Sequence, residues 1–124
     1  MPKNYVNTGF VPGNSSYADV SNVSHTSTVN FTAKATSVKV ATATQRMVSD
    51  TLTIISPFGV KSCTPGDCEV GQLNASAKIA LNFPFGDTES LDGLVSELNR
   101  ILAIWKANNM AYGVVPPVTA QLNA

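Results

Sequence analysis

The chain has 124 residues, enough for one modest hydrophobic core and too few for two domains with an interface between them. Its 8 basic and 8 acidic residues cancel at pH 7, so no overall field draws the protein to nucleic acid or to a membrane, and any such binding must be local. No stretch reaches the roughly 20 apolar residues of a membrane span, and the start lacks the apolar core of a signal peptide, so we expect a soluble chain without an export signal.

The first half of the sequence predicts strands behind a polar amino-terminal segment. Residues 1–24 are rich in Asn, Gly, Ser and Pro and predict either an irregular arm or a hairpin. From residue 25 onward, β-branched and small residues nearly alternate, which is typical of a sheet. We predict three strands and one turn here: strands at 28–34, 36–44 and 50–56, and the turn at 45–49.

Residues 57–74 contain three Gly and two Pro and predict a long exposed loop. After this loop, residues 76–83 alternate again and predict a strand with Ile79, Leu81 and Phe83 on one face. Pro84 ends the strand, because proline cannot donate a hydrogen bond to a ladder.

The carboxyl-terminal part of the sequence predicts one long helix. Asp87 or Thr88 can cap it, and Asn108 and Asn109 predict its end. Apolar residues recur at helical spacing and form a single stripe, which we expect in the core or at a dimer interface. The stripe consists of Leu91, Leu94, Val95, Leu98, Ile101, Leu102 and Trp105. Pro116 and Pro117 predict a last short helical turn that runs to residue 121.

Strands followed by a helix predict a single α+β domain with an antiparallel sheet. Its parts are an amino-terminal hairpin or arm at 1–24, the sheet at 25–84 with its loop at 57–74, and a helical region at 87–124. We expect the helix stripe to pack on a sheet face that contains Val38, Val40, Leu52, Ile54, Ile79, Leu81 and Phe83. The opposite face is polar and mildly basic. It is either a solvated surface or a surface for RNA phosphates and base edges.

No pattern predicts an enzyme, a metal site or a cofactor. The single His25 comes without a nucleophile elbow or an oxyanion loop, and the glycines lack the spacing of a phosphate-binding loop. Acidic residues at 87, 89 and 92 are explained by a charge-complemented helix start. Cys63 and Cys68, with one distant histidine, fall short of a four-ligand zinc set. The two cysteines form either an intrachain bridge or a pair of free thiols.

Residues 51–103 resemble the coat proteins of the single-stranded RNA bacteriophages, the leviviruses. The resemblance lies in the order of a strand, a long loop, a final strand ending Leu81-Asn82-Phe83-Pro84, a short turn and a long amphipathic helix. It implies an antiparallel sheet whose edge strand pairs with that of a second subunit, with helices that cross onto the partner's sheet. The resemblance thus implies an interlocked homodimer that assembles into an icosahedral shell.

The resemblance also implies site residues by position. An RNA-binding inner face would consist of Lys34, Ser37, Lys39, Thr51, Thr53, Lys78 and Asn82, and the dimer interface or core would contain Leu91, Leu94, Leu98, Ile101, Leu102 and Trp105. The segment Cys63-Thr64-Pro65-Gly66-Asp67-Cys68 is similar to the paired-cysteine loop of some members, in which disulfides join neighbouring subunits. Cys63 and Cys68 would then form bridges between subunits.

The function implied by the resemblance is a structural capsid protein of the virion, assembled in the bacterial host cytoplasm around single-stranded genomic RNA. An RNA hairpin that represses translation is a further target, and no small-molecule substrate is expected. The Thr-, Ser- and Asn-rich strands leave one alternative, a secreted or surface β-rich subunit such as a fimbrial or adhesion module. That alternative predicts an intrachain bridge between Cys63 and Cys68, whereas the coat hypothesis predicts bridges between chains.

Overall fold

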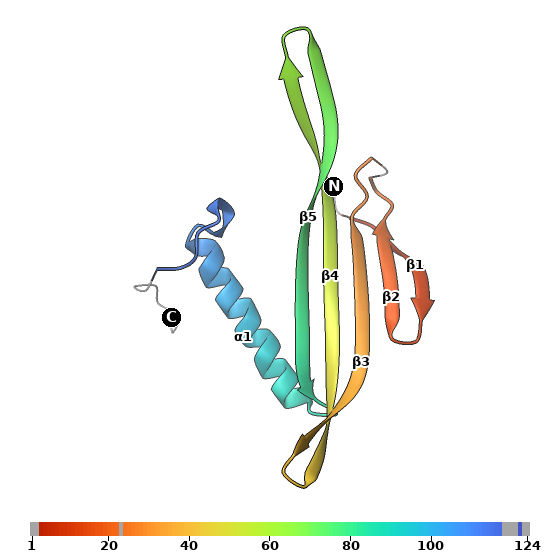
Figure 1. Ribbon diagram of the computed structural model, residues 1–124, viewed down its shortest axis with the longest axis vertical. Coiled ribbons are helices and arrows are strands. Elements are labelled where there is room, and N and C mark those ends of the chain that lie inside the picture. The colour runs from red at the N-terminus through yellow and green to blue at the C-terminus, as the bar shows by residue number, and fades with distance from the viewer. Residues whose placement is uncertain (1–2, 23, 118–121, 123–124) are drawn as a thin grey trace. The chain divides into compact units, whose positions relative to one another are not determined.

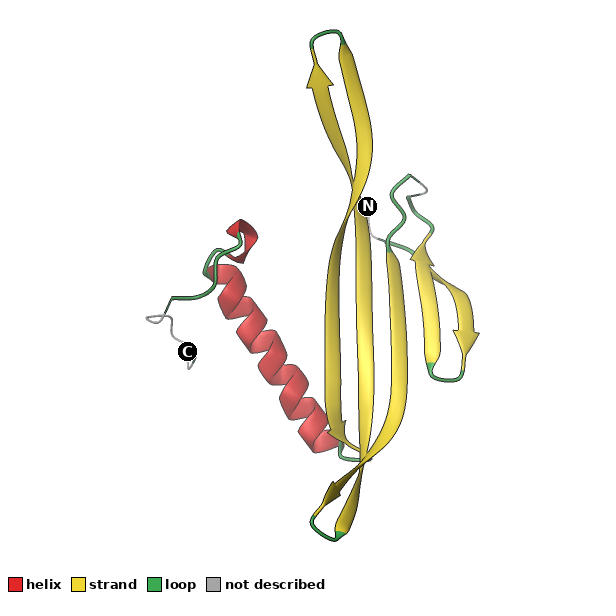
Figure 2. Cartoon of the chain, viewed as in Figure 1, coloured by secondary structure: helices red, strands yellow, loops and turns green. Residues whose placement is uncertain are grey.

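The computed structural model describes residues 3–22, 24–117 and 122. The chain forms two compact units, Met1–Phe85 and Gly86–Ala124. The first unit is an antiparallel sheet and the second is helical (Figure 1 and Figure 2). This architecture confirms the predicted α+β class with an antiparallel sheet before a carboxyl-terminal helix.

The sheet has five strands in chain order, each antiparallel to the next (Figure 1). The strands are β1 at Tyr5–Val11, β2 at Asn14–Asp19, β3 at Thr28–Val40, β4 at Ala43–Thr64 and β5 at Asp67–Pro84. The paired β1 and β2 decide between the two predictions for the amino-terminal segment in favour of the hairpin. Gly13 turns this hairpin with a φ of +85°, and a Cβ there would lie 3.0 Å from the carbonyl oxygen of Ala33. Only glycine fits this approach without displacing the backbone.

β3 is one unbroken strand, so the predicted break near residue 35 and the predicted turn at 45–49 are wrong. Residues 34–36 pair with 47–49 in the same register as their neighbours. The chain turns instead between Val40 and Ala43, where Ala41 has a φ of 56°. Left-handed turn positions usually hold glycine or asparagine. An alanine there leaves no signal in the sequence.

The predicted loop at 57–74 is also wrong, because β4 and β5 continue through it as a paired ribbon. Their register runs without a shift to Thr64 opposite Asp67. Pro65 and Gly66 make the turn, and Gly66 has a φ of +89°, as the second central residue of a type II turn requires. β3 begins at Thr28, opposite Ile55, so the ribbon has no third strand beyond that point. We call this two-stranded part, residues 56–75, the arm, and from here on the word refers only to this segment and not to residues 1–24.

The helix α1, Thr88–Ala107, confirms the predicted start and end. Asp87 caps it by accepting hydrogen bonds from the Ser90 amide at 2.9 Å and the Ser90 hydroxyl at 2.7 Å. These bonds, the amide bond first, lower the pKa of Asp87. Asn108 is the C-cap.

A short 3-10 helix that was not predicted, η1 at Met110–Tyr112, follows α1. Behind it, the Trp105 indole N–H donates to the Val114 carbonyl at 2.9 Å. The turn predicted after Pro117 falls largely on residues 118–121, outside the described residues. No helix among the described residues is long and apolar enough to cross a membrane.

Among the described residues, no apolar side chain is buried, and the buried polar ones are Asp19 and Ser27. Asp19 ends β2, and its Oδ1 accepts from the Asn4 amide at 2.8 Å, the Ser21 amide at 3.0 Å and the Ser21 hydroxyl at 2.6 Å. These bonds, led by the Ser21 hydroxyl, lower the pKa of Asp19 below its ordinary value of 3.8. The carboxylate therefore ties the amino-terminal segment to the end of β2.

Replacement of Asp19 by asparagine is expected to lower the melting temperature at neutral pH, because an amide accepts these hydrogen bonds less strongly than a carboxylate. A lowered pKa in the folded state stabilises the fold above the ordinary pKa, and this gain disappears as the pH falls through the lowered value. The difference in melting temperature between wild type and Asp19→Asn should thus be constant down to about pH 4 and shrink below it. Asp67→Asn, at the tip of the arm, is the control. An equal difference at all pH values would contradict the prediction.

Candidate nucleic-acid interface

The three long strands hold one register throughout, and this separates their side chains into two faces. β3 pairs with β4 from Thr28 opposite Ile55 to Val40 opposite Ala43, and β4 pairs with β5 from Met47 opposite Pro84 to the end of the arm, with no shift in either ladder. Side chains alternate along a strand, and directly paired residues share a face. The register alone therefore assigns each residue to a face.

We call one side of the block in which β3, β4 and β5 lie together the polar face. It consists of Thr28, Asn30, Thr32, Lys34, Thr36, Met47, Ser49, Thr51, Thr53, Ile55, Ser76, Lys78, Ala80, Asn82 and Pro84. The charged residues of the polar face are Lys34 and Lys78, and the face contains no acidic residue. Asn30 extends the face onto β2, since its side-chain amide donates to the Asn14 side chain and the Ser16 hydroxyl, each at 2.8 Å. Hydroxyls, amides and ammonium groups thus cover a face that carries only positive charge.

Five of the seven residues predicted to bind RNA lie together on the polar face. Thr53 is paired directly with Lys78, and Thr51 with Ala80. Ser49 lies between Lys34 on one side and Asn82 on the other. Both lysines are thus one strand away from the central β4.

Ser37 and Lys39 do not belong to this face, and their assignment to it was wrong. They occupy the other parity of β3, and the polar-face parity at that end holds Val38 and Val40, which were predicted to be core. The prediction placed a break near residue 35, which resets the alternation, but β3 runs straight through it. Residues 28, 30 and 32, missed as members of the face, become visible once β3 is read as one strand.

The polar face suits contact with a nucleic-acid backbone. Lysine ammonium groups pair with phosphates, and hydroxyl and amide groups bond to phosphates, sugars and base edges. No aromatic side chain stands on the polar face within the block, so the stacking platform of many RNA-binding sheets is not part of it.

We call the opposite side of the same block the apolar face. It consists of Val29, Phe31, Ala33, Ala35, Val48, Asp50, Leu52, Ile54, Ala77, Ile79, Leu81 and Phe83. Tyr17 of β2 extends it, because its ring meets that of Phe31 edge to face at 5.9 Å between centroids. Asp50 is the sole polar member of this face.

The base of the arm is held by the segment between β2 and β3. The His25 ring packs on Gly59, where a Cβ would lie 3.5 Å from Nε2, and the Ser27 hydroxyl reaches that of Ser56 at 3.4 Å. Lys3 donates to the Ser27 hydroxyl at 2.5 Å. His25 thus has a packing role here. No group of three or more His, Cys, Asp or Glu side chains in the described chain is placed to hold a metal ion.

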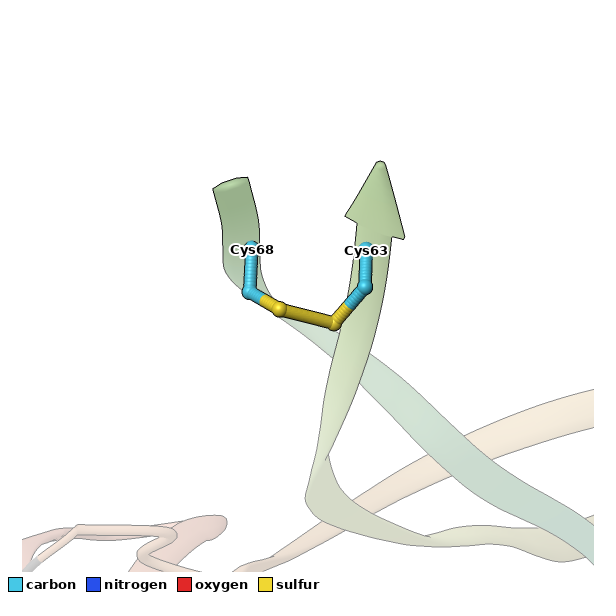
Figure 3. Close-up of a disulfide and its surroundings, with 2 residues drawn as sticks. All are labelled: Cys63 and Cys68. Carbon is cyan, nitrogen blue, oxygen red and sulfur yellow. A yellow bond between two sulfur atoms is a disulfide. The ribbon is translucent and has the colours of Figure 1, made fainter. Parts of the chain in front are cut away.

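Cys63 and Cys68 form a disulfide within the chain, near the tip of the arm (Figure 3). They are direct partners of β4 and β5, with Cα atoms 4.0 Å apart. The prediction of disulfides between subunits is therefore wrong. Each cysteine sulfur forms one disulfide bond, and both sulfur atoms are bonded to each other within the chain. The ribbon conformation of residues 57–74 is the physical reason, since it places the two cysteines opposite each other.

Removal of the disulfide with Cys63→Ser and Cys68→Ser is expected to loosen the tip of the arm, because an isolated two-stranded ribbon is marginally stable in water. Amide hydrogen exchange should speed up between residues 60 and 71 and stay unchanged in the three-stranded block. On non-reducing gels the oxidised wild type should run as a single chain. A ladder of covalent multimers would contradict the intrachain pairing.

Comparison with protein families and with curated protein sequences gives no match. Solved structures do match in fold. A subunit of the virus-like particle of bacteriophage ESE001 is similar with a TM-score of 0.71 and 13% identity over 95% of this chain and 96% of that chain. The particle of bacteriophage PQ-465 gives 0.67 and 9% over 98% of both chains, and that of Beihai levi-like virus 32 gives 0.68 and 13% over 93% and 89%.

The intrachain disulfide is the pairing that the surface-module alternative predicted, and it occurs in a chain that shares the fold of these particle subunits. At these identities the likeness concerns the fold. Along nearly its whole length, the chain has the levivirus-like coat fold of the subunits that build these virus-like particles.

Proposed function

We propose that this protein is a structural capsid subunit that pairs with a second copy, assembles into a closed shell and encloses single-stranded RNA. The observation that carries the proposal is the near-complete overlap of the fold with subunits of three virus-like particles. On this proposal the protein is a component of a phage virion, assembled in the host cytoplasm, and has no catalytic role.

The outer edge of β5 supports pairing with a second copy. β5 is the last strand of the sheet, it is 18 residues long, and its ladder with β4 has no bulge. The other edge strand, β1, has 7 residues and a register irregularity between Asn7 and Gly9. A long regular edge presents unpaired N–H and C=O groups and accepts another strand, whereas a short bulged edge resists it.

The apolar surfaces support an interlocked arrangement in which each helix lies on the partner's sheet. Edge pairing joins one row of backbone groups, whereas a stable specific interface buries about 1,200–2,000 Å² in total. The apolar face and the α1 stripe supply such area, since neither contains a buried apolar side chain. Burial between copies would gain the hydrophobic free energy that the chain leaves unused.

The polar face supports RNA as the enclosed partner. The overall charge of the chain is zero, so attraction to RNA must come from a local concentration of positive charge. Lys34 and Lys78 supply it on a face free of carboxylates. Contacts of this kind are largely independent of base sequence, which favours packaging of RNA over recognition of one hairpin.

One observation favours the second candidate, a secreted or surface module. The disulfide between Cys63 and Cys68 is intrachain, and such bonds persist in oxidising compartments. Electron microscopy of the purified recombinant protein, with absorbance at 260 and 280 nm recorded on the same chromatographic peak, separates the candidates. Uniform shells with a nucleic-acid-rich spectrum are expected. A small protein-only species would contradict the capsid proposal.

Lys34→Ala and Lys78→Ala are expected to reduce the RNA content of assembled particles, because each removes a phosphate contact from the polar face. For binding to a single-stranded RNA oligonucleotide, each substitution should make the negative slope of log affinity against log salt shallower by about 0.7. Lys39→Ala, which removes the same charge from the opposite parity of β3, is the matched control and should leave the slope unchanged. Equal effects of all three substitutions would show that only total charge matters.

A further inference from the structure

Asp50 lies at the centre of the apolar face. It stands on β4, the middle strand of the block, between Ala33 on β3 and Leu81 on β5. The next residues on the same face of β4 are Val48 and Leu52. Its Oδ1 atom is buried and has no hydrogen-bond partner among the described residues.

An unpartnered carboxylate oxygen at this position is unfavourable once the face is covered. Burial of a charged group without a hydrogen bond costs much more than burial of an apolar group of the same size. A purely apolar surface that covers this face would thus leave the Asp50 carboxylate without a hydrogen bond, which costs free energy. Whatever packs here must bring a hydrogen-bond donor to the middle of the face.

The helix α1 carries one such donor at the matching place. The apolar block from residue 29 to 35 is about 20 Å long, and the stripe from Leu91 to Trp105 is about 21 Å long. Leu98 is the midpoint of the stripe. Asn99 follows it and borders the stripe, since it lies four residues after Val95 and three before Leu102.

Other donors of the helix are less suited to this role. The Ser90 hydroxyl bonds to the cap Asp87, the Arg100 guanidinium bonds to Glu97, and the Trp105 indole N–H bonds to Val114. Thr88 begins α1 and Lys106 lies in its last turn, so both are far from the middle of the stripe. Ser96 is two residues away from Leu94 and from Leu98, so it does not lie on the side of the helix that carries the stripe. The side chain of Asn99 makes no hydrogen bond within the described part of the chain.

We propose that Asp50 is a polar key of the subunit interface, which accepts a hydrogen bond from Asn99 of a second copy and thereby fixes where α1 lies on the apolar face. This inference rests on the proposed interlocked dimer and adds the pair of residues that sets its register. Apolar packing alone tolerates sliding by a helical turn, whereas a single buried polar pair is satisfied in one register only.

The sign of a substitution cycle tests the pair. Asn99→Ala leaves the carboxylate buried and unpaired, so it should lower the melting temperature of the assembled protein more than Asp50→Ala does. Adding Asp50→Ala to Asn99→Ala should then raise the melting temperature, because the unpaired charge is removed. Additive losses in the double variant would overturn the proposal.

Cross-linking tests which copy supplies the helix. Two differently tagged chains, one with Asp50→Cys and one with Asn99→Cys, are co-expressed, and the purified oxidised protein is treated with a short bismaleimide. The native disulfide does not react with this reagent. A covalent product that contains both tags is expected. Thr51→Cys, the neighbour of Asp50 on the polar face, combined with Asn99→Cys, should give none.

The outcomes separate this inference from the proposed function. Light scattering of the untreated wild type shows whether copies associate at all, and a monomer would contradict the dimer itself. Association without a product from the two tagged chains would overturn the pairing alone. Cross-linking only inside a single chain that carries both substitutions would also overturn it, since the protein's own helix would then cover Asp50.

Discussion

The unbroken register of β3, β4 and β5 is the constraint on which the other features depend. Because neither ladder shifts, alternate residues stay on the same side of the sheet over the full length of the block. One side of the sheet is therefore the polar face and the other is the apolar face. The same register carries β4 and β5 past the end of β3 and sets the two cysteines opposite each other at the tip of the arm.

The separation of the faces links stability to assembly. A chain whose described apolar side chains are all at least partly exposed has little hydrophobic free energy of its own, so the proposed association of copies would be coupled to folding. With zero net charge and few charged residues, long-range repulsion between copies is small as well. The features that weaken an isolated chain are thus the ones that favour a particle.

Sequence patterns predicted the parts of the fold that depend on local chemistry. The helix was located correctly because a capping aspartate and a regular stripe mark it directly. Turns were harder to predict: Ala41 gives no signal of its left-handed backbone, and Pro57, Gly59 and Gly71 are typical of loops although they lie in paired strands. Ser37 and Lys39 were assigned to the wrong face because the predicted break near residue 35, which β3 lacks, inverts the alternation of side chains beyond it. The sequence could not single out Asp50, because its position among apolar side chains depends on how β4 pairs with β3 and β5.

A face defined by parity constrains how such a chain can change over evolutionary time. Substitutions that keep the polarity of a position preserve both faces, which is consistent with one fold shared at 9–13% identity. A single-residue insertion or deletion inside β4 would instead invert every position beyond it and exchange the two surfaces. Length variation should therefore concentrate at the turns around Ala41 and Gly66, and the three strands that these turns connect should change in sequence while keeping their number of residues.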